Sequence, residues 1–187
     1  NYAITNNTFT GSDFDAIRIR EVVGSGVISN NIFTDVGDRA AVDTQTRDAI
    51  DTAFSGKSLT ISNNTMKNIA RVGIDVKGIA TSGEGLGFGT DGLVISGNQI
   101  EQVGFHGVAV AGVGNTVVSG NVLMYCNDDN EFDTGSVGNA ALIIKDNTAA
   151  SDDDIQSSVI VTNNVAAYNY GRGIFVEARN EQVDVIN

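Results

Sequence analysis

A six-residue phrase recurs along the chain and constrains its fold more than any other feature. The six copies begin at residues 4, 28, 61, 95, 118 and 161. Each copy has an apolar β-forming residue first, Ser or Thr second, Asn or Gly third and Asn fourth, as in Ile28-Ser29-Asn30-Asn31. A phrase that returns at intervals of about 20–50 residues is typical of a protein built from stacked structural repeats.

The spacing of the phrase points to β-structure. The fourth-position residues are Asn7, Asn31, Asn64, Asn98, Asn121 and Asn164, at intervals of 24, 33, 34, 23 and 43 residues. The shortest of these repeats cannot contain a pair of helices. A second apolar stretch begins ten residues after the asparagine and alternates with period two, as in Ile17/Ile19 and Ile74/Val76. This alternation of β-branched residues predicts strands.

The same stretch begins at Ala41 in the second repeat, at Val108 in the fourth and at Ile174 in the sixth. In the fifth repeat it begins at Leu142, after an insertion of 11 residues. The second repeat reads Ala41-Val42-Asp43, which would direct Asp43 inward, so we expect a one-residue slip or a bulge there.

Repeats of this kind pair each strand with its copy in the next repeat when they stack about 4.8 Å apart. We therefore expect an all-β fold, a right-handed single-stranded parallel β-helix of about six coils with loop insertions, whose hand follows the crossover rule. Residues 1–187 form one β-helix segment in this interpretation. The fourth-position asparagines are predicted to form one stacked ladder of hydrogen-bonded amides.

The two ends of the chain suggest continuation. The sequence begins within a repeat at Asn1, and Val183-Asp184-Val185 starts a further return of the phrase. A β-helix end exposes unpaired strands and an open core, which natural proteins cover. We therefore expect a longer polypeptide, with flanking coils, a capping domain or a stacked subunit at both ends.

Charge and composition exclude some function classes. The chain has 11 Lys plus Arg and 23 Asp plus Glu, a formal net charge of −12. This acidity argues against nucleic acid as a partner. The sequence has no run of about 18 apolar residues, so we expect no membrane insertion. The single cysteine, Cys126, falls in an apolar column and is interpreted as an inert core thiol.

The phrase, the coil of about 23 residues and the segment Tyr168-Asn169-Tyr170-Gly171-Arg172-Gly173-Ile174 resemble the pectate-lyase-like right-handed β-helix superfamily. That superfamily includes polysaccharide lyases, alginate C5-epimerases, glycoside hydrolases, phage tailspikes and adhesins. The epimerase motif Asp-Pro-His is absent, because the chain has no proline. The polygalacturonase pattern is also absent, so no family residue is carried over as catalytic.

Candidate site residues lie on the outward face of the second strand. A basic stripe there can neutralise the carboxylate of a uronate sugar, and a Lys, Arg or His can take the proton from C5. The candidate catalytic residues are Lys77, His106 and Arg172. The candidate substrate-binding residues are Arg18, Asp75, Lys145 and Glu177. The alternative is a solvated strand face with cross-strand ion pairs, in which His106 is an exposed edge residue.

Insertions are expected on both sides of this strand. Residues 44–58, 78–91 and 146–157 follow it, and residues 125–138 precede it, so the loops can form a groove over the sheet. The most acidic insertion alternates carboxylates at Asp129, Glu131 and Asp133, as loops that bind hard cations do, which makes Ca²⁺ the candidate metal. A solvated charged loop is the alternative, and paired carboxylates also serve glycoside hydrolysis.

These features lead to two hypotheses of function. The first is an extracellular carbohydrate-acting domain, a lyase or C5-epimerase on an acidic polysaccharide. The second is a non-catalytic fibre, tailspike or adhesin segment, at the cell or virion surface, that binds a glycan or acts as a spacer.

Overall fold

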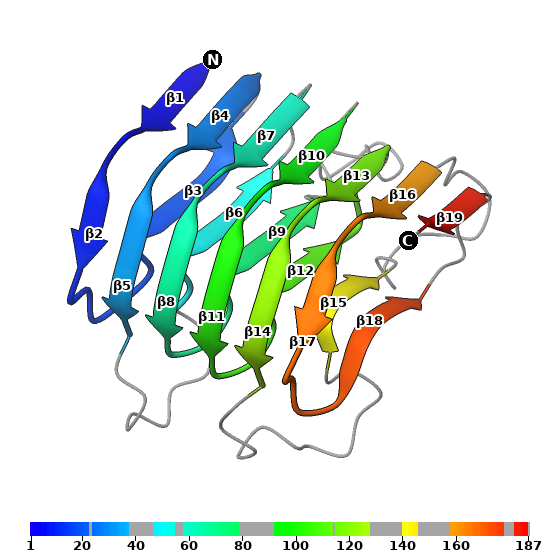
Figure 1. Ribbon diagram of the computed structural model, residues 1–187. Helices are drawn as coiled ribbons and strands as arrows, with labels where there is room; N and C mark the ends of the chain where they lie inside the picture. Colours follow the sequence, from blue (N-terminus) through cyan, green and yellow to red (C-terminus); the bar gives the residue numbers. More distant parts are fainter. Residues whose placement is uncertain are drawn as a thin grey trace.

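The chain forms three parallel β-sheets wound around one core (Figure 1). The computed structural model describes residues 1–22, 24–37, 47–54, 58–78, 92–113, 115–127, 140–145, 158–177 and 182–186. In these segments the regular elements are strands β1 to β19. Strand pairing within each sheet is parallel throughout the described ranges.

Each sheet takes one strand from every coil. Sheet A contains β1 (Tyr2–Thr5), β4 (Ser25–Ser29), β7 (Ser58–Ser62), β10 (Leu93–Ser96), β13 (Thr116–Ser119), β16 (Ser158–Thr162) and β19 (Gln182–Ile186). Sheet B contains β2 (Thr8–Thr10), β5 (Ile32–Val36), β8 (Thr65–Ile69), β11 (Gln99–Val103), β14 (Val122–Cys126) and β17 (Val165–Ala167). Sheet C contains β3 (Ile17–Val22), β6 (Ile50–Phe54), β9 (Ile74–Gly78), β12 (Val108–Ala111), β15 (Ala140–Lys145) and β18 (Arg172–Glu177).

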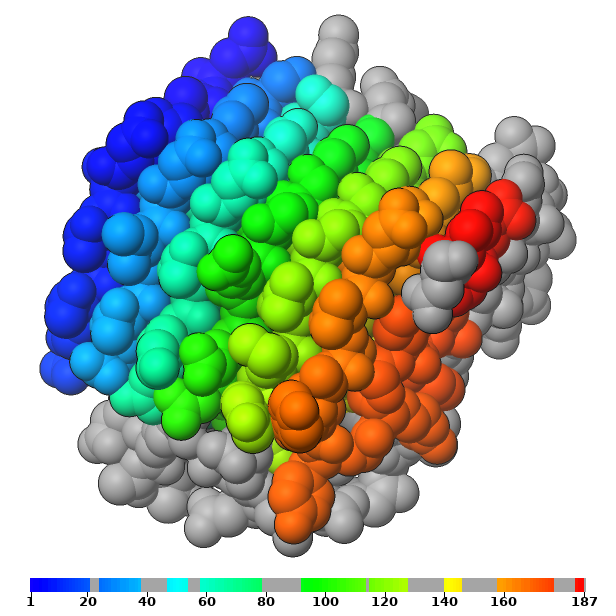
Figure 2. Space-filling view, in the orientation of Figure 1, coloured from blue at the N-terminus to red at the C-terminus, as the bar shows by residue number. Residues whose placement is uncertain are grey.

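The chain passes through sheets A, B and C in turn, so that one circuit is one coil. Six coils are complete, and β19 begins a seventh by pairing with β16. Figure 2 shows the coils as adjacent bands that follow one another in chain order. The prediction of a right-handed parallel β-helix with about six coils is confirmed, with three strands in each coil.

The core consists of apolar residues stacked in columns along the solenoid. Ile28, Ile61 and Ile95 are register partners in sheet A and are completely buried. Phe9 and Phe33 stack with ring centroids 4.9 Å apart. Repeating one residue type at one position therefore fills the same volume in each coil, which is the physical basis of the recurring phrase.

The phrase spans the turn between sheets A and B. Its third residue takes a left-handed conformation in all six coils, with φ between 55° at Asn63 and 65° at Gly97. Asn and Gly tolerate this conformation best, which explains why they alone occupy the position. The fourth residue forms the predicted ladder, in which each amide oxygen accepts hydrogen bonds from the preceding asparagine.

Sequence prediction and structure differ at β6, the sheet C strand of coil two. Sheet C takes Ile50 as the partner of Ile17 and Ile74, whereas Ala41-Val42-Asp43 lies outside the described residues. The strand begins 19 residues after its ladder asparagine instead of ten, so the extra residues precede it. The expected insertion at 44–58 is therefore wrong, because it includes β6.

The solenoid leaves the edges of all three sheets unpaired at β1–β3 and at β17–β19 within the described residues. A hollow of about 440 Å³ at the first coil is lined by Asn1, Tyr2, Ile4, Arg18, Ile19 and Arg20. Flanking coils or a cap at these ends stay a prediction. In the described segments we find no helix of the length and hydropathy that crossing a membrane requires.

Candidate functional site

The outward face of sheet C is charged on its first three strands and mostly apolar beyond them. Arg18 of β3 lies beside Asp51 of β6, which lies beside Asp75 of β9. The same row continues with Ala109, Ile143 and Phe175. Two residues further along the strands, the next row contains Arg20, Ala53, Lys77, Ala111, Lys145 and Glu177. Parallel register therefore gathers Arg18, Asp75 and Lys77 around Asp51.

Asp51 is the centre of this arrangement. Its carboxylate is fully buried and accepts a short hydrogen bond from Nη2 of Arg20. Arg18 Nε lies 3.9 Å from Asp51 Oδ2, and Lys77 Nζ lies 3.5 Å from Asp51 Oδ1. The exposed fraction of the side chain is 49% for Arg18, 37% for Arg20 and 40% for Lys77. One buried carboxylate thus fixes three cations that still face solvent.

Arg71 joins this group to a second set of buried carboxylates. Its Nη1 donates to Asp48 Oδ2 at 2.6 Å, and its Nη2 donates to Asp75 Oδ2 at 3.4 Å. Lys77 Nζ lies 2.7 Å from the same oxygen of Asp75. Asp48 also accepts a hydrogen bond at 3.0 Å from the backbone N–H of Val72. Each carboxylate therefore meets a cation, as burial of charge requires.

Asp15 completes what we call the charged cluster, which consists of Asp15, Arg18, Arg20, Asp48, Asp51, Arg71, Asp75 and Lys77. Asp15 Oδ1 accepts a hydrogen bond at 2.8 Å from the backbone N–H of Asp48. Asp15, Asp48 and Asp51 each place a carboxylate oxygen within 4.8 Å of the others. Grouped carboxylates are typical of cation sites. In this cluster, however, the four carboxylates face four side-chain cations, which already supply the opposing charge.

Burial alters the titration of the cluster. It raises the pKa of Asp48 to about 8, although the Arg71 guanidinium opposes that shift and the carboxylates of Asp75, Asp15 and Asp51 add to it. Burial also raises the pKa of Asp15, and the hydrogen bond from the Asp48 backbone opposes the rise. Interacting carboxylates titrate as a group. The cluster therefore binds a proton at a higher pH than a free aspartate does.

His106 lies in the turn before β12 and is buried, contrary to its prediction as an exposed edge residue. Only 5% of its surface is exposed. Its Nδ1 lies 2.7 Å from the carbonyl oxygen of Ala140, which can only accept, so Nδ1 carries the proton. Burial lowers the pKa of His106 to about 4. A neutral imidazole with this pKa is a weak proton acceptor at neutral pH.

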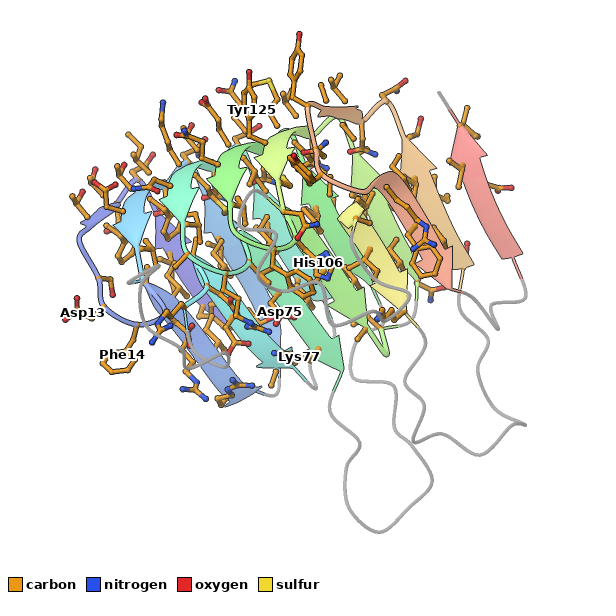
Figure 3. The ribbon with its side chains drawn as sticks, turned by 90° about the horizontal axis from the view of Figure 1, so that it is seen from below. Asp13, Phe14, Asp75, Lys77, His106 and Tyr125 are labelled. Carbon is orange, nitrogen blue, oxygen red and sulfur yellow. The ribbon has the colours of Figure 1, made fainter. Side chains whose placement is uncertain are left out.

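The other predicted site residues lie in different places. Figure 3 shows Asp75, Lys77 and His106 in one region of the molecule. Lys145 and Glu177 are register partners on β15 and β18, separated from β9 by the apolar strand β12. Arg172 is exposed at the start of β18, and its guanidinium lies 4.9 Å from the centre of the Phe175 ring. Asp129, Glu131 and Asp133, the candidate Ca²⁺ ligands, lie outside the described residues, as does most of the insertion at 125–138.

The sequence prediction missed Asp48, Asp51 and Arg71. The signal that could have found the first two is a second repeated phrase, Asp-Ala-Ile, at residues 15–17 and 48–50. It places Asp48 in the row of Asp15 and Asp51 in the row of Arg18, whereas the fixed spacing of ten residues started the stretch at Ala41. Cys126 is fully buried, and burial raises its thiol pKa to about 12, as the interpretation of an inert thiol requires.

The comparisons with known proteins support the fold. A family model described as "Right handed beta helix region" matches residues 50–187, which is more than half of the chain. The search of curated proteins and the search of solved structures each returned no match.

Proposed function

The chain belongs to the right-handed β-helix family, and from this premise we propose that the outward face of sheet C binds an acidic polysaccharide. The observation that supports the proposal best is the trio of partly exposed cations, Arg18, Arg20 and Lys77, around the buried Asp51. Arg18 and Arg20 lie on β3 and Lys77 lies on β9, on the two sides of β6, which carries Asp51. The two sides are therefore separated by twice the strand spacing of the sheet, about 10 Å.

Such an arrangement suits a chain of sugars that carry carboxylates. Guanidinium groups present planar donors that match a carboxylate, while the ammonium group of Lys77 acts as a compact point charge. The charged groups of these side chains are held by the buried carboxylates of Asp51 and Asp75, so that less side-chain entropy is lost when a ligand binds. The three side chains are 37–49% exposed, so part of each cation faces solvent and is available to a ligand carboxylate.

Binding has stronger support than turnover. Neutralising a uronate carboxylate makes its C5 proton easier to remove, which is the step that lyases and epimerases share. Removal also requires a base. His106 is buried with a pKa of about 4, and Lys77 is paired with Asp75 at 2.7 Å. Lyase or epimerase chemistry is therefore the finer proposal, with Lys77 as the exposed candidate, and a non-catalytic adhesin is the alternative.

The polysaccharide proposal also implies a location outside the cell or on a cell or virion surface, where such polymers occur. Ca²⁺ at Asp129, Glu131 and Asp133 stays part of the proposal, as a bridge between the acidic chain and an acidic ligand.

The test is binding of the 187-residue chain to polygalacturonate and to alginate, with neutral amylose as the comparison polymer. We expect both acidic polymers to bind, and binding to weaken with salt. The Arg18→Ala/Lys77→Ala variant should lose most of the affinity, while Lys67→Ala, which removes an exposed cation from sheet B, serves as the control. Equal binding of amylose, or unchanged affinity in the double variant, contradicts the proposal.

Turnover is measured separately in the same samples. A lyase produces an unsaturated uronate that absorbs ultraviolet light, and an epimerase exchanges the C5 proton with solvent deuterium. Either signal, lost in Lys77→Ala, identifies an enzyme. Binding with neither signal identifies the non-catalytic alternative.

A further inference from the structure

Three of the four tyrosines of the chain lie together on another face of the solenoid. Tyr125 is at the end of β14, and Tyr168 and Tyr170 follow β17 in the next coil. They are 42%, 75% and 62% exposed. In Figure 3, Tyr125 lies at the upper edge of the molecule, away from Asp75 and Lys77. Large exposed aromatic residues in one patch are a feature of binding surfaces.

The backbone at two of these tyrosines is unusual. Tyr125 and Tyr168 have φ values of 52° and 57°, in the left-handed region. The same column contains Gly11, Asp35, Asn68 and Gln102 in the earlier coils, also with positive φ. A bulky residue in this conformation is an outlier, and such strain is concentrated at functional sites. The solenoid alone therefore gives no reason for two tyrosines where Gly or Asn fits better.

The two rings form a flat stack. Their centroids are 5.3 Å apart and their planes differ by 13°. Met124 and Ala167, the residues before them, are register partners in sheet B, so the stack follows the spacing of the coils. The more exposed ring, Tyr168, offers a flat apolar face with a hydroxyl group at its edge.

A hollow of about 300 Å³ lies beside this column on sheet B. It is lined by Thr65, Met66, Lys67, Gln99, Ile100, Glu101, Val122 and Met124. Lys67 Nζ lies 3.7 Å from Glu101 Oε2, so the two charges in the hollow cancel each other. The volume is at the lower limit of the range of about 300–1,000 Å³ for ligand pockets. Met124 borders the hollow and directly precedes Tyr125 on β14, so the hollow and the tyrosine stack meet on the same strand.

We propose that this surface of sheet B, formed by the hollow and by Tyr125, Tyr168 and Tyr170, binds a neutral saccharide. A sugar ring has an apolar face that packs on an aromatic ring, and hydroxyl groups that need paired donors and acceptors. The tyrosine stack supplies the first, and Lys67, Gln99 and Glu101 supply the second. The balanced charge of the hollow favours an uncharged ligand over the acidic polymer proposed for sheet C, and the two sites are independent.

The experiment uses the complete 187-residue chain with cello-, malto- and manno-oligosaccharides as probes. Binding is measured by calorimetry and by tyrosine fluorescence, which tryptophan does not obscure because the chain has none. We expect at least one probe to bind, with affinity reduced about tenfold in Tyr125→Gly and in Tyr168→Gly. Glycine suits the left-handed backbone, so both variants should keep a cooperative melt.

Two matched controls isolate the rings. Gln102→Gly makes the same backbone change in the same column and keeps both tyrosines, and Phe14→Ala removes an exposed ring elsewhere, since Phe14 is 65% exposed. Both should bind as the wild type does. The proposal is overturned if none of the probes binds, if the tyrosine variants bind normally, or if Lys77→Ala abolishes binding instead. It is also overturned if the tyrosines hold two copies of the chain together, which light scattering of wild type and Tyr168→Gly detects.

Discussion

Asn64 donates two hydrogen bonds to the amide oxygen of Asn98 in the next coil, one from its backbone N–H and one from its side-chain Nδ2, each 3.0 Å long. Asn98 in turn donates from the same two groups to Asn121. Both Asn64 and Asn98 are completely buried. The ladder therefore satisfies, at one turn of each coil, a backbone group that water cannot reach.

Replacing Asn98 by alanine should destabilise the protein, because the backbone N–H and Nδ2 of Asn64 lose their acceptor. We expect a loss of about 1–3 kcal/mol in the free energy of unfolding, measured by denaturant titration. Asn7→Ala is the matched control, since Asn7 is the exposed first member of the ladder. Equal effects in the two variants would mean that burial of the ladder contributes nothing.

The third position of the phrase gives a prediction of the opposite kind. Asn63 has a φ of 55°, which glycine adopts freely and alanine does not. Asn63→Gly should therefore be more stable than Asn63→Ala by about 1 kcal/mol in denaturant melts. At Thr65, an exposed strand residue, the order of the two substitutions should reverse. A less stable glycine variant at Asn63 is incompatible with the backbone described here.

The success of the sequence prediction has a local cause. The third and fourth positions of the phrase specify a left-handed turn residue and a buried amide, and two such requirements fix the register of a coil. Coil two was misplaced because a fixed spacing has no information about an insertion, whereas the chemistry of Asp48-Ala49-Ile50 repeats that of Asp15-Ala16-Ile17. Core contacts thus identify a strand better than its distance from a turn.

The burial of the site residues is harder to predict. Period-two alternation assigns Asp75 and His106 to an outward or edge position, yet 4% and 5% of their surfaces are exposed. Arg71 and Lys77 contact Asp75 from its own coil, and the ring of Phe105 lies 3.8 Å from that of His106. The burial of these two residues depends on neighbouring long side chains and turns. Period-two alternation along one strand carries no information about where those neighbours lie.

Removing a cation from the charged cluster should destabilise the protein more than removing the charge of a carboxylate. Arg20→Met leaves the buried carboxylate of Asp51 without its closest donor, and we expect a loss of about 1–3 kcal/mol in the free energy of unfolding. Asp51→Asn instead frees cations that are 37–49% exposed and can be hydrated, so its effect should be about 1 kcal/mol or less. Denaturant melts compare the two variants directly. If Asp51→Asn is the more destabilising variant, the prediction is wrong. The remaining cations, Arg18 and Lys77, then compensate the buried carboxylate fully when Arg20 is removed.

His106 should make the protein sensitive to acid. Its pKa is lowered from the ordinary 6.5 to about 4 by burial, so below pH 6.5 the unfolded chain binds a proton that the folded chain does not. The contribution of His106 to stability therefore falls as the pH decreases from about 6.5 to about 4, and it is read as the difference between the wild type and a His106 variant. The variant His106→Gln, which keeps a polar group near the Ala140 carbonyl, should lose this dependence when thermal melts are recorded across that range. Unchanged acid sensitivity in the variant would assign the effect to other groups.

Asp48 gives the reverse dependence over a wider pH range, which includes that of His106. Burial raises its pKa from 3.8 to about 8, so between these values the folded chain retains a proton that the unfolded chain releases. Its contribution to stability is complete below about pH 4 and is lost as the pH rises through 8, at no more than about 1.4 kcal/mol per pH unit. Between pH 6.5 and 8 the shift of His106 has no effect, so the wild type should become less stable there while Asp48→Asn stays level. The matched control is Asp13→Asn, which alters an exposed carboxylate and should follow the wild type. A flat wild-type profile in this window would show that Arg71, at 2.6 Å, holds Asp48 ionised despite its burial.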